Sequence, residues 1–321
     1  MKQITGQMIF GVFMLWLVCV AASFAIGDGT QRMETIQTIP QATEPEGDTK
    51  LRHTVHLLLE GKDHVIELED YLVGVLLSEM PASFHQQAKR AQAVAARTFT
   101  VRMAQQNYRH GSCAVCADPG CCQGYLSPED FLLAGGGVDA VEQAREAVQE
   151  TAGMVLTYQN ALIEATYFSC SGGRTEDAVS VWGTEVPYLQ AVDSPGEEGA
   201  EYYMATVRFT AEEFQNKLGI SLKGNPTHWF GSVSYTDGGG VDAIQIGGKT
   251  YSGTQLRSLL DLRSSSFTVT PLSHAVLITT RGFGHRVGLS QYGADAMAKS
   301  GSSWQEILAH YYLGTEIKSY N

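Results

Sequence analysis

The stretch Asp70-Tyr-Leu-Val-Gly-Val-Leu-Leu-Ser-Glu-Met-Pro81 decides how this chain of 321 residues presents one carboxylate, Glu79. Proline disfavours helical geometry at the residue before it, so the run predicts a helix that breaks beside Glu79. A second helix is expected over residues 86–106, where alanines replace large side chains at many positions. Glu79 would then lie where a helix opens into a loop, which suits a catalytic carboxylic acid. The simpler alternative is a solvated glutamate at a helix end.

The composition describes an acidic globular protein with a substantial core. Apolar residues make up 44% of the chain and charged residues only 17%, and the formal net charge is −12. This length suggests one large domain or two closely associated ones. An acidic surface repels polyphosphate, so we expect no nucleic-acid partner, whereas a neutral or mixed-charge polymer is compatible with it.

The N-terminus predicts the compartment. Residues 8–26 are uncharged and long enough to cross a bilayer core, which takes roughly 20 residues. We therefore expect residues 1–26 to form an uncleaved transmembrane anchor, with a cleaved signal segment ending near Ser23-Phe-Ala25 as the alternative. Residues 27–50 are polar and contain prolines, which predicts a flexible stalk. Residues 51–321 would then form the functional domain, outside the cytoplasm.

Strands and helices are mixed downstream without regular alternation, which predicts an α+β fold. We expect a hairpin over residues 54–68, a helix over 138–151, strands over 154–158, 162–168 and 203–209, a helix over 210–218, a strand-rich segment over 233–253, a helix over 252–262, strands over 267–270 and 275–279, and a largely helical tail over 289–312.

A cysteine-rich loop offers a candidate metal site. His110, Cys116 and Cys122 are spaced six and six apart, and an imidazole with thiolates suits tetrahedral zinc. Oxidising compartments instead favour disulfides. The alternative is therefore a set of disulfides drawn from Cys113, Cys116, Cys121, Cys122 and Cys170. These five cysteines are an odd number, so at least one is unpaired or ligating.

The C-terminal block Arg281-Gly-Phe-Gly-His-Arg-Val-Gly-Leu-Ser-Gln-Tyr-Gly-Ala294 surrounds four polar side chains with glycines. Glycine lets backbone approach a ligand closely. His285, Ser290, Gln291 and Tyr292 are donors and acceptors of the kind that bind sugar hydroxyls, although His285 could equally be a buried, satisfied histidine. The loop of residues 169–173 is a comparable polar segment.

Together these motifs resemble the SpoIID family of sporulation proteins, whose domain is shared with amidase enhancers. The similarity runs from about Leu51 to the C-terminus, and its motifs occur in the family's order. They are Glu79-Met-Pro81, Ala91-Gln-Ala-Val-Ala-Ala-Arg-Thr98, Ser171-Gly-Gly173, Val181-Trp-Gly183, Pro187-Tyr-Leu189, the block from Gly284 to Ala294, and Ile307-Leu-Ala-His-Tyr-Tyr312.

The resemblance implies a peptidoglycan lytic transglycosylase acting during engulfment in sporulation. Such an enzyme cleaves the β-1,4 bond between N-acetylmuramic acid and N-acetylglucosamine in denuded glycan strands and leaves 1,6-anhydro ends. Glu79 would be its catalytic acid and base. One alternative is a non-catalytic peptidoglycan-binding amidase activator. Another is a muramidase that uses water, with Asp177 or Asp193 as a second carboxylate.

The resemblance also implies the ligands of a mainly structural Zn²⁺, namely His110, Cys116 and Cys122. Arg97 would orient the substrate or the Glu79 loop, with a structural salt bridge as its alternative. The expected glycan groove adds Tyr167, Ser171, His285, Ser290, Gln291 and Tyr292. The chain departs from the family at Phe168, Cys170 and Arg286. A side chain at Arg286, in place of glycine, would narrow the groove or add a sugar contact.

The family setting implies partners that the residues do not show by themselves. These are peptidoglycan glycan strands, an amidase or endopeptidase, and a polytopic membrane protein of the engulfment complex. The expected location is the mother cell's engulfing membrane, with a single-pass anchor and an extracytoplasmic catalytic domain.

Overall fold

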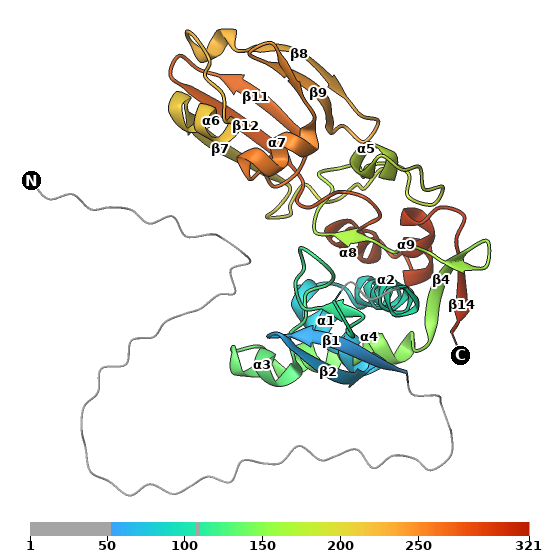
Figure 1. The fold of residues 1–321 in the computed structure, drawn as a ribbon. Helices are drawn as coiled ribbons and strands as arrows, with labels where there is room; N and C mark the ends of the chain where they lie inside the picture. Colours follow the sequence, from blue (N-terminus) through green and yellow to red (C-terminus); the bar gives the residue numbers. More distant parts are fainter. Residues whose placement is uncertain (1–52, 107–109, 321) are drawn as a thin grey trace, which may run out of the picture. The chain divides into compact units, whose positions relative to one another are not determined.

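A computed structural model describes residues 53–106 and 110–320, which form a mixed α+β fold, as the sequence predicts (Figure 1). The expected anchor over residues 1–26 and stalk over residues 27–50 lie outside these residues. Within the described ranges, no helix is both long and apolar enough to cross a membrane.

The predicted helix pair is confirmed as α1 (Leu68–Glu79) and α2 (Gln86–Gln105). The last helical bond of α1 runs from the Met80 N–H to the Leu76 carbonyl, and Pro81 follows directly. The His85 side chain caps α2 by accepting from the Gln87 N–H. All alanines of α2 except Ala104 are buried, so neighbouring elements can pack closely around this helix.

The first hydrophobic core lies between α1, α2 and a small sheet. Strands β1 (Thr54–Leu59) and β2 (Lys62–Glu67) form the predicted hairpin, and β3 (Val115–Cys116) pairs with β1 in parallel. Helices α3 (Pro128–Leu133) and α4 (Val138–Glu150) follow the cysteine loop. This core holds both the end of α1 and the start of the cysteine loop in place.

The second core packs α2 against C-terminal elements. Strand β4 (Met154–Tyr158) lies between β5 (Ala161–Leu162) and β14 (Glu316–Ser319). The expectation of one strand over residues 162–168 is wrong, because β6 (Tyr167–Phe168) leaves that sheet and pairs in parallel with β13 (Leu289–Ser290).

The C-terminal tail is helical only in two separate pieces. It begins as β13 and continues as α8 (Gln291–Lys299). Ser303 then starts α9 (Trp304–Tyr311) with a capping box, in which its hydroxyl accepts from the Glu306 N–H. Helix α5 (Ala178–Trp182), which the sequence analysis did not anticipate, ends at Gly183 in a left-handed conformation.

Residues 204–281 build an inserted module around a third core of their own. One sheet has the order β11-β12-β7 and the other β10-β9-β8. The entry and exit of the module meet, because the Gly282 N–H donates to the Tyr203 carbonyl at 2.8 Å. Its elements are β7 (Met204–Thr210), α6 (Ala211–Leu218), a 3-10 turn (Pro226–His228), β8 (Phe230–Tyr235), β9 (Val241–Ile246), β10 (Lys249–Tyr251), α7 (Gly253–Leu260), β11 (Phe267–Pro271) and β12 (Ala275–Arg281).

A buried ion pair between two residues outside the inserted module, Arg286 and Glu176, contacts the module through Gly238 and Gly240. Arg286 is 2% exposed, and its guanidinium lies 3.0 Å from the carboxylate of Glu176, which is 1% exposed. The same guanidinium donates to the carbonyls of Ser171, Arg174 and Gly238. Its donors are therefore used inside the protein, and the expected sugar contact from Arg286 does not fit this placement.

Candidate active site and metal centre

The Glu79 carboxylate is held by donors from two distant segments. Its Oε1 accepts from the Gly124 N–H at 2.6 Å, and its Oε2 accepts from the Gln291 side-chain amide at 3.3 Å. Glu79 ends α1 and Gln291 begins α8, so the fold brings together the Glu79-Met-Pro81 motif and the block from Gly284 to Ala294. The carboxylate is partly exposed.

Burial raises the pKa of the Glu79 carboxyl above its ordinary value, and the hydrogen bonds from Gly124 and Gln291 oppose that rise. Among the described residues, no other carboxylate contributes to this pKa shift. A carboxyl in this environment keeps its proton at a higher pH than a solvated one and can still release it.

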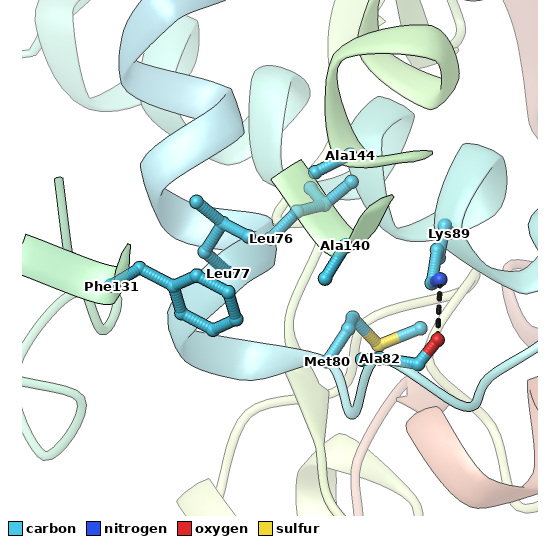
Figure 2. A pocket seen from close by; sticks show the side chains of 8 residues that line it. All are labelled: Leu76, Leu77, Met80, Ala82, Lys89, Phe131, Ala140 and Ala144. Atoms are coloured by element: carbon cyan, nitrogen blue, oxygen red, sulfur yellow. Dashed lines mark hydrogen bonds between the residues drawn. The ribbon is translucent and has the colours of Figure 1, made fainter. Parts of the chain in front are cut away.

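Apolar side chains from α3 and α4 pack against the end of α1. Leu76, Leu77 and Met80 line a cavity of about 20 Å³ together with side chains from α3 and α4 (Figure 2). At its edge the buried Lys89 ammonium donates to the Ala82 carbonyl at 2.8 Å. This bond fixes the turn that follows Glu79, because the lysine extends from the rigid helix α2.

Gln123 joins the cysteine loop to the helix pair. Its side-chain amide donates to the hydroxyls of Tyr71 and Thr100, at 3.1 and 2.9 Å, and its carbonyl oxygen accepts from the Tyr167 hydroxyl at 2.9 Å. Burial, together with the nearby charge of Glu79, raises the pKa of Tyr167. Tyr167 therefore lies near the acid, and its hydroxyl is committed to Gln123.

The cysteine loop brings four metal-ligating side chains together: His110, Cys116, Cys121 and Cys122 offer atoms that all lie within 4.8 Å of one another. The His110 Nε2 is 3.3 Å from the Cys122 Sγ and 3.6 Å from the Cys121 Sγ. Tetrahedral zinc places such ligand atoms roughly 3.3–3.8 Å apart. The donor set therefore fits zinc, with Cys121 as a fourth ligand beyond the three expected.

The disulfide alternative finds no support in the structure. All five cysteines within the described residues are thiols. Burial raises the pKa of the Cys122 thiol to about 12, and burial also raises that of Cys121. A divalent cation would favour the thiolates that burial opposes, since metal binding is coupled to thiol deprotonation.

The metal cluster is linked to the acid through the two residues that follow Cys122. Cys122 is followed directly by Gln123 and by Gly124, whose N–H binds Glu79. A Cβ added at Gly124 would lie 2.5 Å from the Ser78 hydroxyl oxygen and 3.0 Å from the Glu79 Oε1. Only glycine allows the loop to approach the acid this closely.

If Glu79 is the catalytic acid that the family resemblance implies, Gly124→Ala is expected to lower the rate of glycan cleavage by about 10²-fold, since small displacements of a catalytic group are costly. The added methyl group would push Glu79 or its loop out of position. Initial rates on denuded strands measure the effect. Gly137→Ala is the matched control, because a Cβ there meets nothing within 4 Å. Equal rates for the two variants would contradict the role of the Gly124 contact.

A buried carboxylate that the sequence analysis missed organises the C-terminal block. Glu197 is 1% exposed and accepts from the hydroxyls of Ser171, Ser194 and Ser290. The Gly172 N–H donates to it as well. Ser171 and Ser290 were expected to bind glycan, but both are fully buried and hold Glu197 instead. Glu197 lies in an acidic, glycine-bearing run that resembles a solvated surface, so no sequence signal marked it.

Two of the other residues expected in the groove, His285 and Tyr292, contact aromatic rings. His285 is partly buried, packs against the rings of Phe168 and Trp182, and has a pKa that burial lowers to about 4. It is therefore neutral at physiological pH. Tyr292 contacts Phe84 edge-on and is partly exposed. Gln291, as described above, contacts Glu79 itself.

Arg97 does not lie at the site surface. It is fully buried and makes a two-pronged ion pair with Glu69, at 3.0 and 2.6 Å, and it also donates to the carbonyls of Val148 and Met154. The expectation that Arg97 contacts substrate does not fit this placement. Its alternative, a structural salt bridge that fixes α1 against α2 and β4, does.

The proposed second carboxylates are engaged elsewhere. The Asp177 side chain accepts from the Ala191 N–H at 2.8 Å, and Asp193 pairs with Arg174 at 2.6 Å. Within the described residues, the groups that shift the pKa of Glu79 therefore include neither aspartate.

Comparison with known proteins agrees with this architecture. The family described as Stage II sporulation protein matches residues 61–158. Stage II sporulation protein D of Bacillus subtilis (strain 168) is 41% identical over 257 residues, which covers 78% of this chain and 74% of that protein. The protein of the same name from Bacillus amyloliquefaciens is 42% identical over 259 residues, with 78% and 74% covered. The chain belongs to the SpoIID family of sporulation proteins.

A more distant relative carries a different name. The Amidase enhancer of Bacillus subtilis (strain 168) is 27% identical over 307 residues, which covers 78% of this chain and 40% of that protein.

Proposed function

We propose that this protein is a lytic transglycosylase that cleaves the β-1,4 bond between N-acetylmuramic acid and N-acetylglucosamine in denuded glycan strands. The observation that supports this most is the single Glu79 carboxyl, which is partly buried, raised in pKa and held by Gly124 and Gln291. Hydrolysis of this bond needs two carboxylates or substrate assistance. A lytic transglycosylase needs one group that serves first as acid and then as base.

In the proposed cycle, protonated Glu79 gives its proton to the oxygen of the departing sugar. The resulting carboxylate then takes the proton from the C6 hydroxyl of the muramic acid, whose oxygen attacks C1 and closes the 1,6-anhydro ring. No water is consumed. The Gly124 N–H and the Gln291 amide stabilise the carboxylate in the second half of the cycle, since hydrogen bonds to an ionised carboxyl favour it.

His110, Cys116, Cys121 and Cys122 would hold zinc in a closed tetrahedral site. Four protein ligands leave no open position, so zinc would supply a structural crosslink rather than a reactive water. Its effect on Glu79 would pass through Gln123 and Gly124. In the cell, we place the protein in an engulfment complex at the mother-cell membrane, anchored by residues 1–26, with an amidase and a polytopic membrane protein as partners.

The products of digestion test the proposal. The full-length protein is incubated with denuded strands, and the released fragments are analysed by mass spectrometry. Anhydro ends, lighter by one water than reducing ends, are expected. Reducing ends would indicate a muramidase instead. Intact strands that remain bound would indicate the second candidate, a non-catalytic activator of an amidase, which the similarity to the Amidase enhancer favours.

The pH profile of cleavage should follow the protonated fraction of Glu79. Because burial raises this pKa, the loss of activity on the alkaline side is expected at a pH clearly above the ordinary glutamate value of about 4.3. Gln291→Leu removes a hydrogen bond that favours the ionised form, so it should move this limb to still higher pH. A limb near pH 4.3, or one that moves downward in the variant, would contradict the assignment.

The full-length protein is expected to contain about one zinc ion per chain, measured by atomic emission after dialysis. Cys122→Ala should lose most of the metal and, with it, most of the cleavage activity, because the loop carrying Gly124 is no longer fixed. Cys113→Ala is the control, since this buried thiol is outside the cluster. Full activity of a metal-free Cys122→Ala protein would show that cleavage by Glu79 does not depend on the metal.

A further inference from the structure

A cleft that does not include Glu79 lies where the inserted module meets the second core. It has a volume of about 500 Å³. One wall is the Gly172-Gly173-Arg174 loop, and the other is formed by residues at the ends of β7, β8, β11 and β12. None of its lining residues is a hydrogen-bond partner of Glu79 within the described part of the chain.

The cleft continues onto an uncovered, polar sheet face. In the register of β11-β12-β7, Thr268, Thr279 and Thr206 lie side by side, and the hydroxyls of Thr206 and Thr279 are 2.9 Å apart. One step along this face, Arg281 lies opposite Met204. Hydroxyl groups on a flat strand surface offer both donors and acceptors, which suits a sugar chain.

Arg281 is the distinctive charge in this cleft. Its side chain is exposed, and no carboxylate pairs with it among residues 53–106 and 110–320. The neighbouring Arg174 is instead held between Asp193 and Asp237, at 2.6 Å from each. In a chain with a net charge of −12, an unpaired guanidinium beside a polar cleft attracts a carboxylate ligand.

Two tyrosines and the rim of the cleft, which is the Gly172-Gly173-Arg174 loop, complete the cleft. Tyr203 and Tyr235 line it, and Tyr235 is 52% exposed. Such rings can stack on the apolar face of a sugar. Gly172, at φ +76°, has no room for a Cβ, which would lie 2.7 Å from the Gly282 nitrogen. The loop therefore lies directly against the end of β12, beside Arg281.

We propose that this cleft is a distal subsite that binds the free lactyl carboxylate of a muramic acid residue through Arg281. This inference rests on the proposed function, since it names which feature of the glycan strand the same protein recognises. The subsite is linked to the acid by a continuous set of bonds. Gly172 donates to Glu197, Ser290 donates to the same carboxylate, and the adjacent Gln291 donates to Glu79.

The subsite gives a physical basis for choosing peptide-free strands. Once the stem peptide has been removed, the lactyl group ends in a carboxylate, which can accept a two-pronged bond from arginine. In a strand that carries peptides, the same group is a neutral amide and the peptide occupies space beside the rim.

The test measures the binding of glycan strands to a protein that cannot cleave them. Full-length protein carrying Glu79→Gln is titrated with denuded strands, with denuded strands whose lactyl carboxylates have been converted to methylamides, and with peptide-bearing strands. Denuded strands should bind about tenfold more tightly than methylamide strands, as loss of a charge-assisted bond predicts. Adding Arg281→Gln should abolish this preference, whereas Arg208→Gln, on the same sheet face but outside the cleft, should retain it.

Equal binding of denuded and methylamide strands would overturn the proposal, as would equal effects of the two arginine variants. Binding of peptide-bearing strands that depends on Arg281 would assign the carboxylate to the stem peptide and reject the lactyl group. A separate arm keeps Glu79 intact and compares strand cleavage by the Arg281→Gln protein. Because the binding arms need no catalysis, failure of the proposed chemistry and failure of the subsite give different results.

Discussion

Glu79→Gln abolishes glycan cleavage and leaves strand binding intact: this is the expected result with the largest effect on activity. Glutamine keeps the shape of the side chain and can still meet the Gln291 amide, but it cannot donate a proton as an acid or accept one as a base. General acid–base catalysis typically contributes about 10²–10⁴-fold, so a loss of about 10³-fold is expected. Mass spectrometry of released anhydro fragments measures the rate.

The matched control is Glu142→Gln, because Glu142 is an exposed glutamate on α4 that is not a hydrogen-bond partner of Glu79. It should cleave at the rate of the unchanged protein. Co-sedimentation with denuded strands checks that the Glu79→Gln protein still binds. If the Glu79→Gln protein cleaves strands at an undiminished rate, Glu79 is not the catalytic group and the proposed mechanism is wrong.

Arg286→Met is expected to destabilise the fold by about 3–5 kcal/mol, the usual cost of removing one partner of a buried ion pair. The substitution would leave Glu176 charged and 1% exposed, and would remove the donors to Ser171, Arg174 and Gly238. Denaturant unfolding of the full-length protein, followed by circular dichroism, measures the loss.

Arg145→Met is the matched control, since Arg145 meets Asp70 at 4.0 Å on the surface. Exposed pairs of this kind contribute about 0–1 kcal/mol. A double variant, Arg286→Met with Glu176→Met, should recover part of the lost stability because no charge is then left buried alone. A loss at Arg286 no greater than that at Arg145 would show that the buried pair is unimportant.

The sequence predicted elements whose signals are local. The break at Pro81, the alanine-rich helix and the capped helices of the inserted module all follow from residues within a few positions of one another. The segment over residues 162–168 was misjudged because its two ends pair with different sheets, β5 with β4 and β6 with β13. That choice depends on residues more than a hundred positions away, which periodicity cannot reveal.

The candidate site shows the same division. The spacing and family motifs predict Glu79, His110, Cys116 and Cys122, whereas Cys121 joins the cluster only in the structure. The donors that hold Glu79, at Gly124 and Gln291, come from two segments that are far apart in the chain. Arg97 and Glu197 show that a polar residue within a motif or an acidic run can serve the interior instead. Burial distinguishes a polar residue that serves the interior from one that serves the site, and no local sequence pattern reveals that burial for Arg97 and Glu197.

The contact between the entry and exit of the inserted module has a consequence for the history of the fold. Since the Gly282 N–H already bonds the Tyr203 carbonyl, the core chain passes this point without a gap. A segment that leaves and returns at one spot can be lost, gained or exchanged without rethreading the rest. Arg286 and Glu176 would still face each other after such a loss, so the junction would remain neutral. Residues 204–281 thus form a module whose loss would leave the path of the remaining core chain unchanged.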